Sequence, residues 1–387
     1  MLPVFKKFSN KDGVLFFFLL CLVIVLRIFV LMDFSFQYTD SDQVIMWQGL
    51  RDYSKGEFHE PRFYGQAYNS MLEAFLAVPL YKLGIPAYKA LPIITTLLAI
   101  FPFVFISLLV FLKRSPKLAL LILSIPLVLP VEYSLITSLP RGFVTGIFIS
   151  SFACLGIFYP KSKRVFLSSF FVTVIGFSLN ANSILLAIPC LVYLFLENIR
   201  NKQFYIYAAI GGIAGLAIHF FANYFYVTHP YNNTHEFPLA FSFADLFTSL
   251  PHLNWYFNDV TPLLWNAGFL SLVLFIILAF LFYRKQEYKK AAVIGFIPVL
   301  ILLSLGVNKV HDGAASVYFS YSRMYLALPV LLAFSISLFS NVTSSGYFYL
   351  YLLLPVSFFG YQLSVLDVKV NAAADPAVFN MVTFAEC

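Results

Sequence analysis

Charged residues are scarce in this chain of 387 residues: Asp, Glu, Lys and Arg make up only 11% of it, whereas hydrophobic residues make up 60%. So few polar side chains cannot cover the surface of a water-soluble protein. Apolar runs of membrane-spanning length, roughly 17–25 residues, recur along the whole sequence. The sequence therefore predicts an all-α polytopic membrane protein, since a β-barrel would show short alternating strands.

Several chemical signatures are missing as well. The four cysteines do not form a disulfide framework, because Cys21, Cys154 and Cys190 lie inside apolar runs and Cys387 is the last residue. We find no glycine-rich phosphate-binding loop, no Cys/His spacing for zinc and no Ser-His-Asp order. A nucleotide-sugar site on the cytoplasmic side therefore has no support. The net charge of +7 does not indicate nucleic acid as a partner, because the basic residues form no single patch.

The basic residues instead fall in short clusters between the apolar runs, as topology signals do. The clusters are Lys6/Lys7/Lys11, Lys113/Arg114/Lys117, Lys161/Lys163/Arg164, Arg200/Lys202 and Arg284/Lys285/Lys289/Lys290. If all of them lie in the cytoplasm, the chain makes about eleven crossings, with its N-terminus inside and its C-terminus outside. The predicted spans are 14–33, 87–112, 117–131, 142–159, 165–180, 183–198, 203–227, 262–283, 290–307, 318–340 and 346–366.

One further apolar segment, 69–84, does not fit this count, because a crossing there would move every later basic cluster outside. It is short and carries Glu73 and Lys82, so we interpret it as an interfacial helix on the outer face. The chain is then a single transmembrane domain, 1–387, whose chemistry belongs to the outer face. The outer segments are a first loop at 34–86, short loops at 132–141 and 308–317, a larger loop at 228–261 and a short tail at 367–387.

Two acids, Asp40 and Asp42, stand where the chain leaves the first predicted span. One interpretation is that they simply end a helix and keep this loop outside. The other is that a carboxylate at the membrane boundary serves as general base, or as metal ligand, for a membrane-embedded substrate. Composition alone does not choose between the two.

The residues after Asp42 have a more specific pattern. The chain carries, in this order, Gly49-Leu50, Gly56, the run Phe63-Tyr64-Gly65-Gln66 with Tyr68, and Leu72-Glu73-Ala74. This pattern resembles the first outer loop of bacterial GT-C-fold glycosyltransferases, the group that includes aminoarabinose and protein mannosyltransferases and uses polyprenyl-phosphate-linked sugars. The resemblance is close over residues 42–84, and the rest of the chain matches only in layout. Two departures are Gln43, where the family has Glu, and Ser70-Met71, where it has Gly.

The resemblance assigns roles to residues of the first loop. It implies a GT-C-like fold in which Asp42 is the catalytic carboxylate, and Asp40 supplies the charge that Gln43 lacks. It implies substrate contacts from the matching side chains of the same loop, which are Tyr64, Gln66, Tyr68 and Glu73. His59 is a candidate for contact with sugar or metal, although a solvated loop residue is the simpler interpretation.

Two later sites are similar to patterns of the same superfamily. In the second outer loop, Arg141-Gly142 matches, but the acids expected after the glycine are missing. Glu132 is the nearest carboxylate, so Asp42 and Glu132 are candidate ligands for a divalent cation such as Mg²⁺ or Mn²⁺, and no cofactor is certain. Arg141 is either a phosphate contact or an interface anchor.

Arg323 and Tyr325 match the Arg-x-Tyr start of a late span. The resemblance implies that Arg323 binds the donor phosphate, since a guanidinium offers paired, permanently charged donors. A snorkelling arginine at the end of a span is the alternative.

The remaining polar residues are weak signals. Asn180 and Asn182 are typical of helix capping, and His219 of a packed side chain. His311-Asp312, next to Gly313, fit either a place in the pocket or a turn.

The implied function is transfer of a sugar from a polyprenyl-phosphate (undecaprenyl-phosphate) donor to an acceptor, expected to be a lipid-linked surface glycan. The expected location is the bacterial inner membrane, with the active site facing the periplasm. The alternatives are an outer-leaflet polysaccharide polymerase or ligase, and a lipid or glycan transporter (flippase). Polymerases and ligases typically depend on arginines and histidines in a large late outer loop, and 228–261 contains no arginine. Transporters usually show repeats or polar midplane residues.

Overall fold

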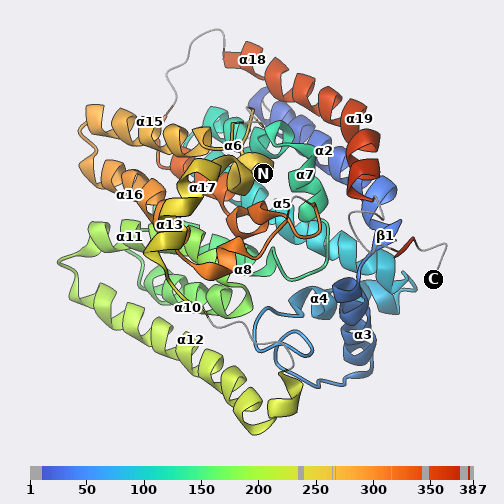
Figure 1. Cartoon of the computed structure of the whole chain (residues 1–387). Coiled ribbons are helices and arrows are strands. Elements are labelled where there is room, and N and C mark those ends of the chain that lie inside the picture. The colour runs from blue at the N-terminus through green and yellow to red at the C-terminus, as the bar shows by residue number, and fades with distance from the viewer. Residues whose placement is uncertain are drawn as a thin grey trace, which may run out of the picture.

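A computed structural model describes residues 11–233, 239–263, 265, 267–314, 316–341 and 348–374, together with the backbone of 382–383. Lys6 and Lys7 of the first basic cluster lie outside these residues, as do 234–238 of the larger predicted loop and most of the predicted tail beyond 374. Within the described part, the protein is all-α apart from one pair of two-residue strands (Figure 1).

The described residues contain five helical segments that are long and apolar enough to cross a membrane. They are Lys11–Ser35 (α2 Lys11–Val30 and a π turn, Leu31–Ser35), α5 Ala87–Lys113, Ala181–Asn198 (a 3-10 turn, Ala181–Ser183, and α11 Ile184–Asn198), α12 Lys202–Thr228, and Phe348–Ala373 (α18 Phe348–Tyr351 and α19 Leu353–Ala373). The prediction of a helical membrane protein is therefore confirmed, whereas the GT-C fold and the number eleven stay predictions.

The other predicted spans contain shorter helices. These are α6 Pro116–Val128, α8 Thr145–Ser151 with α9 Leu155–Phe158, α10 Lys163–Leu179, α15 Leu270–Arg284, α16 Tyr288–Ser304 and α17 Leu328–Ser337. A 3-10 turn, Phe152–Cys154, separates α8 from α9, and another, Tyr321–Tyr325, precedes α17. The predicted spans at 142–159 and 318–340 are thus interrupted helices, and the helix in 262–283 begins only at Leu270.

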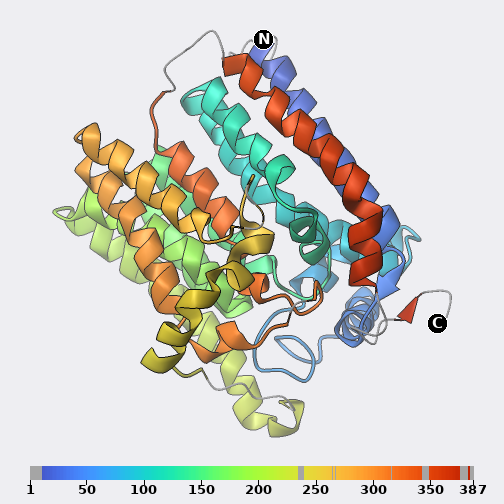
Figure 2. The ribbon, with the colours of Figure 1, turned by 45° about the horizontal axis from the view of Figure 1, so that its top comes forward.

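The last helix is longer than predicted. The predicted span ended at 366, but α19 continues to Ala373, so the helix includes the first part of the predicted outer tail. Neither glycine nor proline occurs between Gly360 and Pro376. The charge of Lys369 is also balanced, because its Nζ lies 2.5 Å from a carboxylate oxygen of Glu132. Figure 2 shows α19 lying side by side with α2.

The basic clusters meet at one end of the helix bundle. The residues with contacts there include Lys11, Arg114, Lys117, Lys161, Lys289 and Lys290. Lys11 and Lys117 both lie over the ring of Tyr349. Arg114 and Lys290 donate to the neighbouring carbonyls of Phe339 and Leu338. The basic clusters therefore lie at the same end of the bundle. The prediction that all of them face one side of the membrane requires this arrangement.

The first loop folds into two helices at the opposite end. α3 (Ser41–Lys55) was not predicted, although both of its ends carry sequence signals: Asp40 accepts a hydrogen bond from the backbone N–H of Gln43, and Gly56 ends the helix with φ +83°. α4 (Leu72–Lys82) lies inside the predicted interfacial segment 69–84. Its 11 residues extend ~16 Å, too short to cross ~30 Å of hydrocarbon.

A separate small core holds these two helices against α5. Met46 and Leu50 of α3, Ala74 of α4 and Leu91 of α5 are buried together with Phe63 of the connecting loop. The first loop is therefore a packed structure, and its polar residues are held in fixed positions.

The remaining elements are short. They are α7 Val131–Ile136, α13 Phe243–Ser249, α14 Leu253–Phe257, and 3-10 turns at Pro230–Asn232, Leu250–His252, Asn258–Val260 and Asn308–His311. Strand β1 (Tyr38–Thr39) pairs antiparallel with β2 (Val382–Thr383), with Tyr38 opposite Thr383. The segment at 382–383 thus returns to the start of the first loop, so both lie at the same end of the bundle.

Candidate active site

A cavity of about 1030 Å³ opens among the first loop, the segment around Arg141, the end of α10, α12 and the segment 309–324. Six of the predicted catalytic and substrate-binding residues line it, namely Asp40, Asp42, Gln66, Tyr68, Arg141 and Arg323. Its charged lining consists of these two aspartates and Asp312 on the acidic side, and Arg62, Arg141, Lys309 and Arg323 on the basic side. The cavity therefore offers carboxylates and cations to the same ligand.

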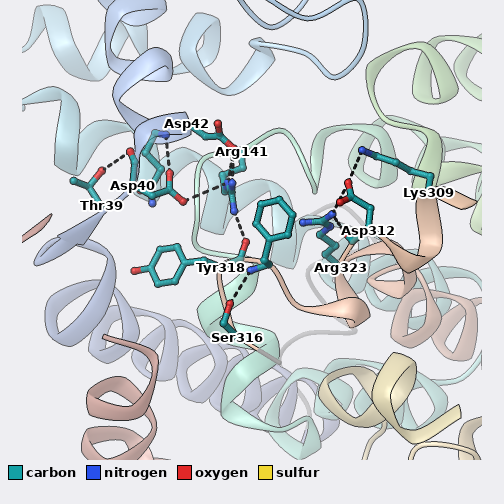
Figure 3. Close-up of polar contacts among 11 residues, drawn as sticks. Thr39, Asp40, Asp42, Arg141, Lys309, Asp312, Ser316, Tyr318 and Arg323 are labelled. Atoms are coloured by element: carbon teal, nitrogen blue, oxygen red, sulfur yellow. Dashed lines mark hydrogen bonds and ion pairs between the residues drawn. The ribbon is translucent and has the colours of Figure 1, made fainter. Parts of the chain in front are cut away.

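Arg141 holds the two aspartates. Its Nε lies 3.1 Å from Oδ2 of Asp42 and 3.5 Å from Oδ2 of Asp40, and Nη2 also contacts Oδ2 of Asp42 (Figure 3). Asp40 is nearly buried, and this burial raises the pKa of its carboxyl group, while the positive charge of Arg141 opposes the rise. Asp42 is more open, with 33% of its side chain exposed. Of the two carboxylates, Asp42 is the one that a ligand in the cavity can reach.

Arg323 and Lys309 form a second charged group around Asp312. Nη2 of Arg323 lies 3.2 Å from Oδ2 of Asp312, and Nζ of Lys309 lies 2.9 Å from the same oxygen. Burial alone would raise the pKa of Asp312, but these two cations lower it below its usual value. Arg141 and Arg323 both lie over the ring of Phe319, at 5.4 and 4.0 Å. The two charged groups are therefore neighbours in one site.

Tyr68 stands between these groups as a neutral donor. Burial, and then the carboxylates of Asp312 and Asp42, raise the pKa of its phenol to about 12. The ring also lies 5.1 Å from Nζ of Lys309. A phenol that keeps its proton at neutral pH cannot act as a base, but it can donate a hydrogen bond to a ligand oxygen.

Gly142 explains how Arg141 reaches the cavity. Its φ of +76° is easily adopted only by glycine, and a Cβ at this position would lie 3.1 Å from the carbonyl oxygen of Ser70. The backbone N–H of Gly142 donates to Oε2 of Glu73, at 2.9 Å. The predicted substrate contact Glu73 is therefore fully buried beneath the site, where it anchors the turn that carries Arg141.

Glu73 gives the protein a measurable pH dependence. Burial raises the pKa of this carboxyl group to about 8, although the N–H of Gly142 opposes the rise. Because the folded-state pKa is raised, the free energy of unfolding is highest below the unfolded pKa of 4.5 and falls as the pH rises from 4.5 to about 8. The loss is at most ~1.4 kcal/mol per pH unit. In Glu73→Gln, which keeps an acceptor for Gly142, we expect melting temperatures in detergent that no longer fall between pH 5 and 8.

The matched control for this measurement is the wild-type protein at pH 5, which we expect to be about as stable as Glu73→Gln. An unchanged pH slope in Glu73→Gln would assign the dependence to other groups.

Tyr325 and Glu132 do not line the cavity. Arg323 and Tyr325 lie in a 3-10 turn of about three residues per turn, so side chains two positions apart point to different sides. Tyr325 is fully buried, and its hydroxyl lies 3.0 Å from that of Ser304. Glu132 is the ion-pair partner of Lys369. The substrate role expected of Tyr325 and the joint metal role expected of Asp42 and Glu132 thus have no geometric support.

His59 and Tyr64 belong to a separate group around Asp52. The hydroxyl of Tyr64 donates to Asp52 at 3.3 Å, and Nε2 of His59 lies 3.6 Å from the same carboxylate. Asp52, Glu57 and His59 bring ligating atoms within 4.8 Å of one another, as a metal site would require. Glu57 and His59 are more than half exposed, however, and this group lies outside the lining of the cavity.

The cavity itself does not fit a divalent cation well. Arg141 is already paired with both Asp40 and Asp42, and a metal bound there would have to compete with this guanidinium for the same oxygens. We therefore derive no chemical step through Mg²⁺ or Mn²⁺.

Several residues that line the cavity were not assigned to the site from the sequence. Lys309 and Arg62 were not among the site residues predicted from the sequence, yet both line the cavity. Asn180 does cap a turn, since its side chain accepts from the N–H of Asn182, but both amides also line the cavity together with His219. For Asn180, Asn182 and Lys309, the available signal was a position at the predicted outer boundary of a span.

Neither family models nor curated proteins nor solved structures give a match to this chain. The resemblance of residues 42–84 to GT-C glycosyltransferases therefore rests on the sequence pattern alone.

Proposed function

We propose that the protein is a glycosyltransferase that moves a sugar from a polyprenyl-phosphate donor to a lipid-linked glycan at the outer face of a bacterial inner membrane. The observation that carries the proposal is the cavity in which a reachable carboxylate, Asp42, lies beside the paired cations Arg323 and Lys309. Transfer of a phosphate-linked sugar needs these two kinds of group close together.

The chemistry divides between the two charged groups. The acceptor hydroxyl oxygen forms a bond to the anomeric carbon while the bond from that carbon to the phosphate oxygen breaks. The electron pair leaves with the phosphate, whose added charge Arg323 and Lys309 stabilise. The hydroxyl proton passes to Asp42 as general base. Arg141 holds only Oδ2 of Asp42 among the described contacts, so Oδ1 is available to the acceptor. Such a direct displacement inverts the anomeric carbon.

Neutral polar groups of the lining fit a sugar. The side-chain oxygens of Gln66 and Asn182 are buried and accept no hydrogen bond within the described residues. Buried acceptors of this kind are costly unless a donor reaches them. Sugar hydroxyl groups are such donors, so these amides support a polyhydroxylated ligand.

The proposal is tested by transfer in liposomes. The purified full chain is reconstituted and supplied with polyprenyl-phosphate-linked sugars and with membrane lipids from cells that lack this gene. We expect mass spectrometry to show one sugar added to a lipid-linked glycan and the donor converted to polyprenyl phosphate. Absence of transfer from every polyprenyl-phosphate sugar offered, with folded protein, would reject the proposed function.

The proposed orientation is tested in intact cells. Cysteine replacing Lys82, after α4, should react with a reagent applied from outside, and cysteine replacing Lys113, at the end of α5, should react from the cytoplasmic side. Labelling of both from one side would contradict the proposed topology.

A further inference from the structure

Among the described residues, Arg62 is the cation of the cavity lining that has no carboxylate partner. It lies in the loop between α3 and α4 and is only 5% exposed. Arg141 is paired with Asp40 and Asp42, and Arg323 and Lys309 with Asp312. No ion pair within the described residues includes Arg62. Within the part of the chain that the structure describes, its positive charge therefore lies in a buried position without an ion-pair partner.

Among the described residues, the groups that accept hydrogen bonds from Arg62 are all uncharged. Nη1 donates to the carbonyl oxygen of Ser178 at 2.6 Å, and Nη2 donates to Oδ1 of Asn223 at 2.8 Å and to Oγ of Ser178 at 3.3 Å. Nε is buried and makes no hydrogen bond within the described residues. The carbonyl of Ser178 belongs to the last turn of α10, whose dipole is worth about half an elementary charge. This interaction explains how the protein tolerates Arg62, but it does not balance a full charge.

His219 and Asn223, one turn apart on α12, add an excess of N–H donors. Nδ1 of His219 lies 3.3 Å from Nη2 of Arg62, and Nε2 lies 3.0 Å from Nδ2 of Asn223. Both neighbours are donors, whereas a neutral imidazole has only one acceptor nitrogen. If the amide of Asn223 were flipped, its NH₂ group would face Arg62. The donor without an acceptor would then lie at the contact between Asn223 and Arg62. At least one N–H of the cluster therefore lacks a proper acceptor.

Burial also lowers the pKa of the Arg62 guanidinium, which reflects the cost of holding this charge away from water. A ligand with several negatively charged oxygens would supply both the missing charge and the missing acceptors. Phosphate esters have this composition, and arginine binds them through paired donors.

We propose that Arg62, with His219 and Asn223, forms a second anion subsite of the cavity, which binds the phosphate or diphosphate of a second substrate. The inference rests on the proposed function, in which Arg323 and Lys309 hold the phosphate of the donor. The acceptor is then itself an anionic lipid in which the glycan is linked through phosphate. The cavity volume of about 1030 Å³ is large enough for two head groups of this size.

The subsite is tested by binding, without transfer. The purified full chain in neutral detergent is titrated with inorganic pyrophosphate and, separately, with a short-chain polyprenyl diphosphate. We expect Arg62→Gln to weaken binding of at least one probe tenfold or more, the effect of losing charge-assisted hydrogen bonds. We expect Arg323→Gln to leave binding at Arg62 in place. Binding of both probes would identify the phosphate group alone as the ligand, whereas binding of the lipid probe only would identify the lipid-linked form.

Two results would overturn the subsite: wild-type affinity for both probes in Arg62→Gln, or loss of all binding in Arg323→Gln alone. Melting temperatures without ligand verify that each variant is folded. If Arg62→Gln does not fold, Arg62→Lys replaces it, because lysine keeps the charge but loses the paired donors, and unchanged affinity would then reject the proposal. Failure of sugar transfer with normal binding at Arg62 would reject only the proposed function.

Discussion

Replacing Asp42 by Asn is expected to lower the turnover number by about 10²-fold or more, the usual size of a lost general base. Asparagine keeps the shape of the side chain and an oxygen that can accept from Arg141, but it cannot take the proton of the acceptor. Arg141 keeps Asp40 as an ion-pair partner at 3.5 Å, so we expect the fold to be retained. Donor affinity should change little, because the donor phosphate is bound at Arg323 and Lys309. Single-turnover transfer assays with bound donor measure this effect.

Asp40→Asn is the matched control, since asparagine is as good a helix N-cap as aspartate and α3 should stay intact. We expect a smaller loss of turnover than in Asp42→Asn. Equal losses that also respond to a chelator would indicate a metal shared by the two acids. Near-normal turnover in folded, donor-bound Asp42→Asn would remove Asp42 from catalysis and leave both acids as topology signals.

Arg323→Ala is expected to weaken donor binding by roughly 10- to 100-fold, which corresponds to the loss of hydrogen bonds from a charged donor. Arg323→Lys should fall between this variant and the wild type, because lysine keeps the charge but not the paired geometry. Asp312 keeps Lys309 as its partner at 2.9 Å, so removing Arg323 does not leave an unpaired acid. Equilibrium binding of a polyprenyl-phosphate sugar in detergent measures the change.

The control for Arg323→Ala is Arg51→Ala, which removes an exposed arginine of α3 that does not line the cavity. We expect donor affinity like that of the wild type. If Arg323→Ala also bound the donor normally, Arg323 would be an interface anchor and the proposed phosphate contact would be wrong.

The sequence predicted local features best. The apolar runs located the membrane-type helices, and the short charged segment at 69–84 predicted a helix that is too short to cross. The ends of α3 could also be predicted from the sequence, because Asp40 and Gly56 are cap residues in suitable positions.

Contacts between distant segments could not be read in the same way. Arg141 pairs with Asp42 across 99 positions, and Arg62 meets Asn223 across 161, because helix packing brings their ends together. No periodicity of the sequence reports which loop residues converge. Tyr325 illustrates a local limit: its pattern suggested a partner of Arg323, but the chain forms a tight 3-10 turn there, and the side chain enters the core.

The pairing of β1 with β2 shows that the site assembles from segments that are synthesised at different times. The loop that carries Asp42 is synthesised early, but it needs Arg141 from the middle of the chain and lies beside Arg323 from a much later segment. Residues 382–383, which leave the ribosome later still, then close onto Tyr38 and Thr39 directly before Asp40. The charged site therefore remains incomplete until the segment that carries Lys309, Asp312 and Arg323 has been inserted.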